Sequence, residues 1–361
     1  MEQKSGRNAK NLRAENRGLL FRYLMTGRAS SRAELAQISG LTKMTVTNII
    51  SEFLADGLIK ESGDGGKARR NNPITLELSA DAPKIIAVLI HRTHLSVALC
   101  SFTLEILAQE SVRITSCDRQ TLVDTLLRLT DHMMAYGNIL GIGIGSIGPV
   151  DIHNGVILNP PDFYGIRDLP VAELFRAHYG LPVFLDYHYN CAALAEKYYG
   201  YGKSYSDYLY LGVTDGLSLG IICSNQLFSS FTGYASEIGH LCVNFDDTVP
   251  DAGFPGAEGC LGKYVDFGRG PEEARRSMEV LAVSMAGLCN VLNPQALILD
   301  NSGGSCPDEL LELLSQELNR RIVLGAYRKI DVLKSYRADN FETASCAISV
   351  VHQVFQGNLM F

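Results

Sequence analysis

Residues 31–57, SRAELAQISGLTKMTVTNIISEFLADG, contain the pattern that decides the fold of the N-terminal part of this chain. Ser31 is a typical helix N-cap residue, with Glu34 three residues later as in a capping box. Gly40 ends this helix, and Thr42 begins a second one with apolar residues at helical spacing. Residues 16–25 predict a further helix before them. Two helices joined by a tight glycine turn indicate a helix-turn-helix, whose second helix enters the major groove of DNA.

The residues after this pair predict a wing. Residues 58–78 read as two short strands around a Gly-rich basic tip, which would lie on phosphates or in the minor groove. The polar start of the second helix can donate hydrogen bonds to bases and phosphates. The alternative is a three-helix packing module with a solvated loop. The predicted DNA-contacting residues are Ser31, Thr42, Lys43, Met44, Thr45, Thr47 and Asn48 in the helices and Lys67, Arg69 and Arg70 in the wing.

Composition and charge divide the chain of 361 residues into two parts. Hydrophobic residues make up 46% and charged residues 20%, which excludes a mostly disordered chain. Residues 1–72 hold 13 Lys and Arg against 7 Asp and Glu, so they carry +6, whereas the remainder carries −13. A basic segment on an acidic body indicates two functions in one chain.

The nine cysteines are scattered and form no C-x-x-C motif. The N-terminus has no apolar stretch before Leu19, and no run approaches the roughly 20 apolar residues of a membrane-spanning helix. We therefore expect a protein of the reducing cytoplasm, without membrane contact, whose cysteines are small core residues.

Beyond Pro83, alternating strands and helices predict an α/β fold. Strands are expected in KIIAVLI, HLSVALC, ILGIGIGS, LPVFLDY and ALILDN, with a strand–turn–strand hairpin in DYLYLGVTDGLSLGIIC. Helices are expected at residues 121–136, in VAELFRAHYG and NCAALAEKYYG, at residues 274–292 and twice more towards the C-terminus.

Five short motifs, together with the helix-turn-helix, resemble the ROK family of repressors and sugar kinases. They are GIGIGSIGPVD, ILNPP, FLDYHYNCAALAE, GYASEIGHL and EGCLG. The resemblance is strongest to the repressor branch that includes regulators of xylose and N-acetylglucosamine genes. It implies a winged helix-turn-helix at residues 1–78 and a two-lobed, actin-like (ribonuclease-H-type) ROK domain at residues 79–361. The small lobe would comprise about 84–188 plus a C-terminal helix at about 344–361, and the large lobe about 189–343.

The motifs for phosphoryl transfer depart from the kinase pattern of the family. Residues 89–94, LIHRTH, stand where the kinases carry D-x-G-x-T, a turn whose glycine lets backbone N–H groups approach phosphate. The kinases also use the Asp of an N-D pair as general base, and Tyr187 and His188 occupy those positions here. Although His can act as a base, the combined losses predict that the protein is not an enzyme.

The zinc motif is reduced in the same way. The family uses the His of E-I-G-H with three cysteines, of which only Cys260 is present. A structural zinc prefers four ligands, so we expect no metal and no other cofactor. A three-ligand site made of His240, Cys242 and Cys260 is the alternative.

Part of the sugar-binding pattern of the family is kept. The resemblance implies ligand contacts for Asn159, His188, Glu237 and His240, whose polar groups suit sugar hydroxyls. A structural pair at the lobe hinge is the alternative for Glu237 and His240. If His188, His240 and Arg92 converge, the cleft would favour a phosphate or carboxylate.

These observations predict a transcriptional regulator, specifically a repressor of carbohydrate-related genes. Its partners would be a double-stranded DNA operator, a sugar or sugar phosphate in the cleft, and further copies of the chain in a homodimer or homotetramer. Two alternatives stay open. One is a sugar kinase with an added DNA-binding module, and the other is a regulator controlled by a protein partner, with a cleft that binds nothing.

Overall fold

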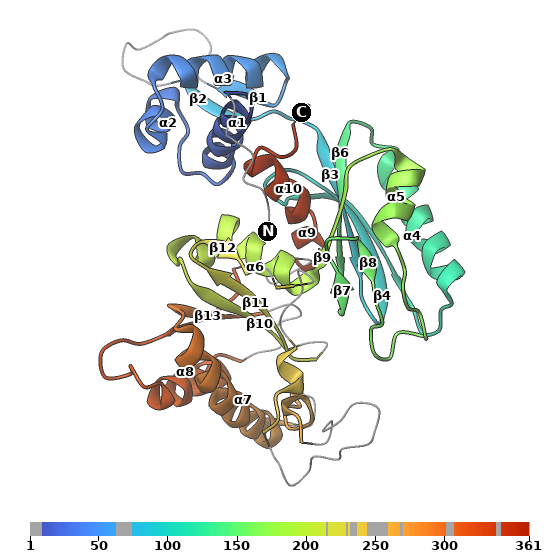
Figure 1. The fold of residues 1–361 in the computed structure, drawn as a ribbon, viewed down its shortest axis with the longest axis vertical. Coiled ribbons are helices and arrows are strands. Elements are labelled where there is room, and N and C mark those ends of the chain that lie inside the picture. The colour runs from blue at the N-terminus through green and yellow to red at the C-terminus, as the bar shows by residue number, and fades with distance from the viewer. Residues whose placement is uncertain are drawn as a thin grey trace.

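The structure, a computed structural model, describes residues 9–62, 74–213, 216–228, 230–231, 237–243, 259–267, 270–300, 307–336 and 341–360. The wing residues Lys67, Arg69 and Arg70 lie outside these ranges. Figure 1 shows an N-terminal helical part beside two sheets, each covered by helices. Within the described ranges, no helix combines the length and apolar character needed to cross a membrane.

Three helices and a strand pair form the N-terminal domain, which the sequence predicts to bind DNA and which is called the DNA-binding domain below. The helices end and begin where the sequence predicts, because Gly40 takes a left-handed conformation and the Thr42 hydroxyl caps the next helix. The first helix begins earlier than the predicted residue 16. Arg17 on this helix pairs with Glu52 and Asp56 and so joins it to the third. The elements are α1 (Ala9–Met25), α2 (Arg32–Ser39), α3 (Lys43–Ala55), β1 (Ile59–Ser62) and β2 (Thr75–Leu78), and β1 pairs antiparallel with β2.

The small lobe contains a five-stranded sheet in the order β5-β4-β3-β6-β9. The first three strands are antiparallel neighbours, whereas β6 and β9 run parallel to β3. Helices α4 and α5 cover one face and α9 and α10 the other (Figure 1). The strands are β3 (Lys84–Ile90), β4 (His94–Cys100), β5 (Ile106–Arg113), β6 (Ile139–Ser146) and β9 (Val183–Tyr187), with a small pair β7 (Val150–Asp151) and β8 (Val156–Ile157). The helices are α4 (Arg119–Met134), α5 (Val171–Tyr179), α9 (Phe341–Ser345) and α10 (Ile348–Phe355).

The large lobe repeats this topology, with its sheet in the order β12-β11-β10-β13-β14. When the strands of each sheet are ranked by their order along the chain, both sheets have the same spatial arrangement: third, second, first, fourth, fifth. The parallel and antiparallel pairs are also the same. This duplication confirms the two-lobed α/β fold. The elements are α6 (His188–Tyr199), β10 (Tyr208–Gly212), β11 (Ser218–Cys223), β12 (Gln226–Leu227), α7 (Pro271–Leu292), β13 (Ala296–Leu299), α8 (Asp308–Arg321) and β14 (Asp331–Lys334), with 3₁₀ turns η1 (Tyr201–Ser204), η2 (Ile238–His240) and η3 (Leu261–Lys263).

The DNA-binding domain and the small lobe share one hydrophobic core. Phe21 of α1 is fully buried, and its ring packs edge-on against Phe53 of α3, Phe102 after β4 and Phe355 of α10, with centroids 5.5, 5.0 and 6.2 Å apart. Gly18 lets α1 approach α10 so closely that a Cβ atom would lie 2.6 Å from the carbonyl oxygen of Phe355. The domain is therefore docked on the small lobe by packing.

Several elements differ from the sequence prediction. Strands β5, β12 and β14 were not expected, and all three are edge strands of their sheets. The C-terminal segment predicted as one helix forms α9 and α10, which pack on the small-lobe sheet. Helix α6 begins at His188 and packs against both sheets. The boundary between the lobes near residue 188 stays a prediction.

Candidate ligand cleft and DNA-binding surface

The start of α3 presents an exposed polar surface. Thr42, Lys43, Met44, Thr47 and Asn48 are exposed, and Met44 retains 75% of its accessible surface. Thr45 is half-buried, and its hydroxyl lies 2.9 Å from that of Thr42. An exposed first turn on the second helix of the pair is the arrangement that reads base edges. Contact of these residues with DNA stays a prediction.

Ser31 occupies a different environment from the other predicted DNA contacts. It retains only 5% of its accessible surface, and its hydroxyl accepts a hydrogen bond from the backbone N–H of Glu34 at 3.3 Å. The carboxylate of Glu34 in turn accepts from the backbone N–H of Ser30 at 2.7 Å. The side chain of Ser31 therefore caps α2 and is almost fully buried, and its contact with DNA stays a prediction.

A cavity of about 450 Å³ lies between the two lobes, a suitable volume for a small molecule such as a sugar. Its small-lobe side includes the turn after β3, the segment after β6 and the end of β9. Its large-lobe side includes the start of β11 and the turns η2 and η3. The polar side chains in its lining are Arg92, Asp162, Tyr187, His188, Ser218, Glu237, His240, Cys260 and Lys263.

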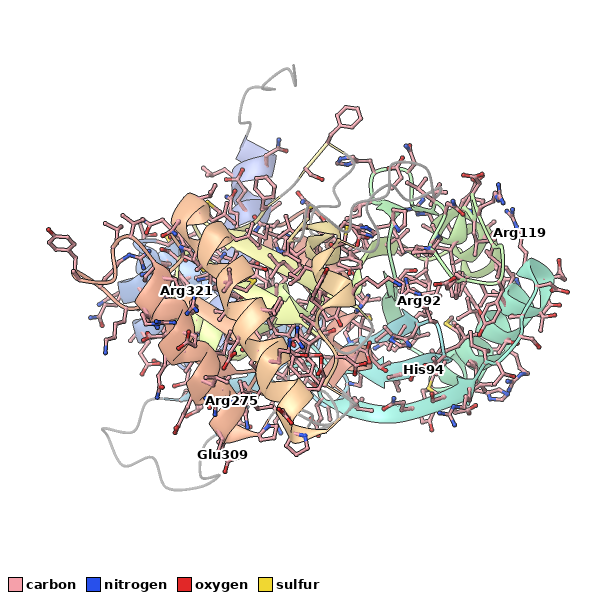
Figure 2. The ribbon with its side chains drawn as sticks, turned by 90° about the horizontal axis from the view of Figure 1, so that it is seen from below. Arg92, His94, Arg119, Arg275, Glu309 and Arg321 are labelled. Atoms are coloured by element: carbon pink, nitrogen blue, oxygen red, sulfur yellow. The ribbon has the colours of Figure 1, made fainter. Side chains whose placement is uncertain are left out.

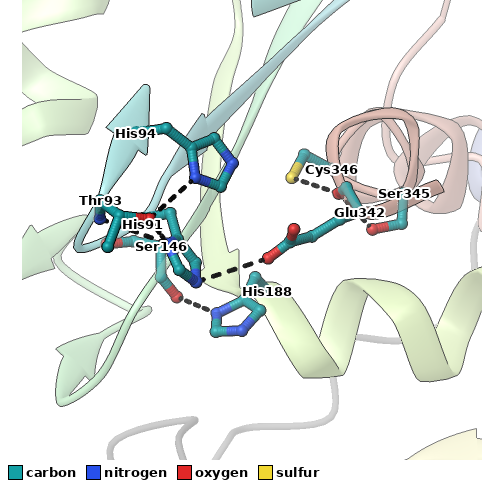
Figure 3. Close-up of polar contacts among 8 residues, drawn as sticks. All are labelled: His91, Thr93, His94, Ser146, His188, Glu342, Ser345 and Cys346. Atoms are coloured by element: carbon teal, nitrogen blue, oxygen red, sulfur yellow. Dashed lines mark hydrogen bonds and ion pairs between the residues drawn. The ribbon is translucent and has the colours of Figure 1, made fainter. Parts of the chain in front are cut away.

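His188 is the buried polar group of this cleft. Its Nδ1 donates to the carbonyl oxygen of Ser146 at 3.0 Å, which leaves Nε2 as a buried acceptor without a partner among the described residues (Figure 3). Burial lowers the pKa of His188 to about 3, so the imidazole is neutral at pH 7. Arg92, His188 and His240 do converge on the cleft, but His188 brings no positive charge for a phosphate. A neutral acceptor suits a hydroxyl group.

A hydrogen bond joins the lobes beside His188. The hydroxyl of Tyr187, at the end of β9, donates to the hydroxyl of Ser218 on β11, and both side chains are buried. On the small-lobe side, Arg92 Nε donates to the carbonyl oxygen of Pro161 at 3.1 Å. The sequence motifs placed Tyr187 at a substituted kinase position, but they did not reveal that it links the two lobes.

Glu237 and His240 lie together in the cleft lining, as the resemblance implies. Their side chains face each other with His240 Nε2 3.9 Å from Glu237 Oε2, and both are exposed. Asn159 is exposed and is absent from the lining, whereas Pro161 and Asp162 are in it. Ligand contact by Asn159 stays a prediction, and Asp162 supplies the polar group of this loop in the lining.

The turn between β3 and β4 is filled by side chains rather than open to a phosphate. His91 is buried, its Nδ1 lies 3.1 Å from the Thr93 hydroxyl, and its Nε2 lies 4.0 Å from Glu342 Oε1 of α9 (Figure 3). The backbone N–H of His91 donates to His94, and that of Thr93 to the His91 ring. These two amides are therefore already used within the hairpin.

The predicted remnant of a zinc site has an unsuitable donor arrangement. Cys242 and Cys260 oppose each other across a β-bridge, and Cys260 Sγ donates to the carbonyl oxygen of His240 at 3.4 Å. Within the part of the chain that the structure describes, no three His, Cys, Asp or Glu residues form a group that could hold a metal ion. The absence of a metal stays a prediction, because residues 244–258 lie outside the described ranges.

A winged helix-turn-helix packed on a duplicated two-lobed body, with a cleft between the lobes, defines a class of proteins that join a DNA-binding domain to a ligand-binding one. Residues 85–270, more than half of the chain, match the ROK family, and the chain belongs to that family.

Three known proteins illustrate the similarity. The xylose repressor of Caldicellulosiruptor bescii is 25% identical over 384 aligned positions, which cover 94% of this chain and 96% of that protein. A ROK family transcriptional regulator, a homolog of the Escherichia coli MLC protein, superposes with a TM-score of 0.80 at 18% identity and covers 96% of this chain and 98% of its own. A ROK family glucokinase from Streptomyces griseus, in complex with glucose and AMPPNP, has a TM-score of 0.63 at 20% identity and covers 73% and 98%.

Proposed function

We propose that this protein is a DNA-binding transcriptional repressor of carbohydrate-related genes, controlled by a sugar or sugar phosphate in the cleft between its lobes. The full-length similarity to the xylose repressor, which includes the DNA-binding domain, carries the proposal. The exposed start of α3 supports operator binding, and the cleft with His188, Glu237 and His240 supports effector binding.

We further propose that the cleft binds its ligand without phosphorylating it. Phosphoryl transfer needs a base near the attacking hydroxyl and a site for the phosphates. His188 has a pKa of about 3, so it is a poor proton acceptor near pH 7. The turn after β3 holds the His91 ring near Glu342, whose carboxylate would repel a phosphate. Similarity to the glucokinase covers 73% of the chain and keeps a kinase as the second candidate.

Self-association in a homodimer or homotetramer belongs to the same proposal, because a dimer matches a pseudo-palindromic operator. An apolar patch on the large lobe supports it. The end of α7 lies beside the loop after α8, since the backbone N–H of Val323 donates to Asn290 Oδ1 at 2.8 Å. The exposed apolar side chains of this patch are Val291, Leu292, Val323, Leu324 and Tyr327.

The experiment that tests the function measures operator binding and thermal unfolding with a panel of sugars and sugar phosphates. A ligand at about 100 times its Kd stabilises the folded state by about 2.7 kcal/mol. We expect Glu237→Ala to abolish this stabilisation and the effect of the ligand on operator binding, while operator affinity without ligand is unchanged. Glu309→Ala, an exposed change in α8 (Figure 2), is the matched control and should respond like the wild type.

The outcomes separate the candidates. Release of ADP from ATP with a sugar would establish the kinase. If no ligand in the panel changes unfolding or operator binding, control by a protein partner becomes the better explanation.

A separate experiment tests the wing. Replacing Lys67, Arg69 and Arg70 together by Ala should reduce the slope of log operator affinity against log salt concentration by the equivalent of up to about three phosphate contacts. An unchanged slope would exclude the wing from the DNA interface.

A further inference from the structure

A second and larger cavity, of about 690 Å³, lies where the DNA-binding domain meets both lobes. Four separate segments line it. They are the end of α1 with the following turn, the end of α6 with η1, the β11–β12 turn, and α10. The lining residues are Arg22, Thr26, Arg28, Lys197, Tyr198, Lys203, Ser224, Asn225, Gln226, Leu227, His352 and Gln356. None of these residues belongs to the lining of the interlobe cleft.

The charge of this cavity is positive. Its lining holds the basic side chains of Arg22, Arg28, Lys197 and Lys203, and the described lining contains no Asp or Glu. Four like charges around one cavity repel each other unless an anion lies among them. Some other cations of the described chain are paired with carboxylates, for example Arg17 with Glu52 and Lys334 with Asp308. The four cations of this cavity share a described lining that contains no carboxylate.

The contacts of these cations are made to neutral groups. Lys197 Nζ donates to the carbonyl oxygens of Gly202 and Tyr205 and to Asn225 Oδ1 at 2.8 Å. The guanidinium groups of Arg22 and Arg28 each lie 5.6 Å from the ring centroid of Tyr23. Burial and then the nearby Arg28 lower the pKa of Lys197, and the Asp207 carboxylate opposes this only in part. An added anion would relieve that repulsion.

The neutral lining residues supply hydrogen-bonding groups around the cations. Thr26, Ser224, Asn225, Gln226 and Gln356 offer hydroxyl and amide groups, whereas Tyr198 and Leu227 supply apolar surface. Arginine and lysine are the side chains that bind phosphate, and the volume suits a ligand larger than a single phosphate ion. We propose that this cavity is a second ligand site, which binds a small phosphorylated anion at the junction of the DNA-binding domain and the two lobes.

Occupancy of this site would affect DNA binding, because its lining residues come from both the DNA-binding domain and the large lobe. Arg22 and Arg28 belong to the DNA-binding domain, and Lys203 and Asn225 belong to the large lobe. An anion held by both groups fixes the domain relative to the large lobe. The site is thus separate in position and chemistry from the interlobe cleft, whose polar lining includes the carboxylates of Asp162 and Glu237.

The test uses inorganic pyrophosphate as a probe, at constant ionic strength, in titration calorimetry on the full-length protein. We expect saturable binding to the wild type and at least a tenfold weaker affinity in the double variant Arg28→Ala/Lys203→Ala. Both side chains are exposed, so folding should be kept. The control Arg119→Ala/Arg275→Ala removes the same charge from α4 and α7, which contribute no residue to the cavity lining, and should bind like the wild type. Figure 2 labels both arginines. Glu237→Ala should also bind pyrophosphate normally, which separates this site from the cleft.

Three results would overturn the proposal. The first is no saturable pyrophosphate binding to the wild type. The second is an equal loss of affinity in both double variants, which would indicate general charge attraction. The third is a loss of operator affinity in Arg28→Ala/Lys203→Ala with unchanged pyrophosphate affinity, which would assign these cations to the DNA backbone.

Discussion

Replacing Gly18 by Ala is expected to weaken the docking of the DNA-binding domain on the small lobe. Gly18 lies inside α1 where the helix crosses α10. A Cβ atom there would lie 2.6 and 2.7 Å from the carbonyl oxygens of Phe355 and Val354, and 2.8 Å from the backbone nitrogen of Gly357. All three atoms belong to the backbone, so no side chain can turn away to make room.

The magnitude follows from two opposing terms. Ala is favoured over Gly inside a helix by about 1 kcal/mol. Overpacking costs about 1–3 kcal/mol, and rigid backbone neighbours place Gly18 at the upper end. We therefore expect the free energy of unfolding to fall by about 2 kcal/mol. Gly287, exposed inside α7, is the matched control, because a Cβ atom there meets nothing within 4 Å. Gly287→Ala should stabilise the protein by about 1 kcal/mol.

Urea unfolding of the wild type and both variants measures these changes, and limited proteolysis between the DNA-binding domain and the body reports the docking itself. Gly18→Ala should be cleaved there faster than the wild type, whereas Gly287→Ala should not. If the two variants were equally stable and equally resistant to protease, the contact between α1 and α10 would not be what holds the domain, and the reasoning would be refuted.

Two further predictions concern the cleft and the pH dependence of stability. Tyr187→Phe removes the hydrogen bond to Ser218 and leaves a buried hydroxyl unsatisfied, so we expect a loss of about 1–2 kcal/mol in urea unfolding and a changed effector affinity. Burial lowers the pKa of His188 to about 3 and that of His352 to about 4. As the pH is lowered, these histidines bind protons in the unfolded chain before they do so in the folded protein. The free energy of unfolding should therefore fall by up to about 1.4 kcal/mol per pH unit per histidine as the pH drops from 6.5 to 4. Asp186, with its pKa raised to about 6 by burial, acts in the opposite direction between pH 6 and 3.8. His352→Gln should therefore flatten the decline measured by unfolding at each pH, and Asp186→Asn should steepen it.

Local sequence signals predicted the DNA-binding domain well because caps, glycine turns and helical periodicity act over a few residues. The Ser31 and Thr42 caps and the Gly40 turn are all present in the structure. The same signals could not identify β5 and β14. Strand β5 is only half-buried and β14 has four residues, so pairing with neighbouring strands, and not an internal pattern, makes them strands.

The candidate cleft was predicted in part, for a related reason. The motifs predicted that His188, Glu237 and His240 lie close together, and the structure brings all three into the lining of one cavity. Their contact with a ligand stays a prediction. The motifs could not show that the Nδ1–H of His188 is held by Ser146, or that Tyr187 reaches Ser218, since these contacts join segments distant in sequence.

The charge of the N-terminal segment illustrates the same limit. Its excess of basic residues indicated a separate function for this segment, but Arg17 pairs with Glu52 and Asp56 inside the domain. Arg22 and Arg28 face the cavity at the junction with the lobes. A net charge counts these residues together, whereas the fold assigns them to different surfaces.

Helix α6 connects these surfaces. His188 at its first residue lines the interlobe cleft, and Lys197 and Tyr198 near its end line the cationic cavity. Twelve residues of helix span about 18 Å. The Tyr198 hydroxyl lies 2.8 Å from His352 Nδ1 of α10, and α10 carries the Phe355 ring that packs against Phe21 of the DNA-binding domain. If the proposed effector changes the lobe angle at His188, it would act on a helix whose other end contacts the support of the DNA-binding domain. These contacts form a continuous chain between the cleft and the predicted operator-binding surface, and coupling along that chain is what the Glu237→Ala experiment measures.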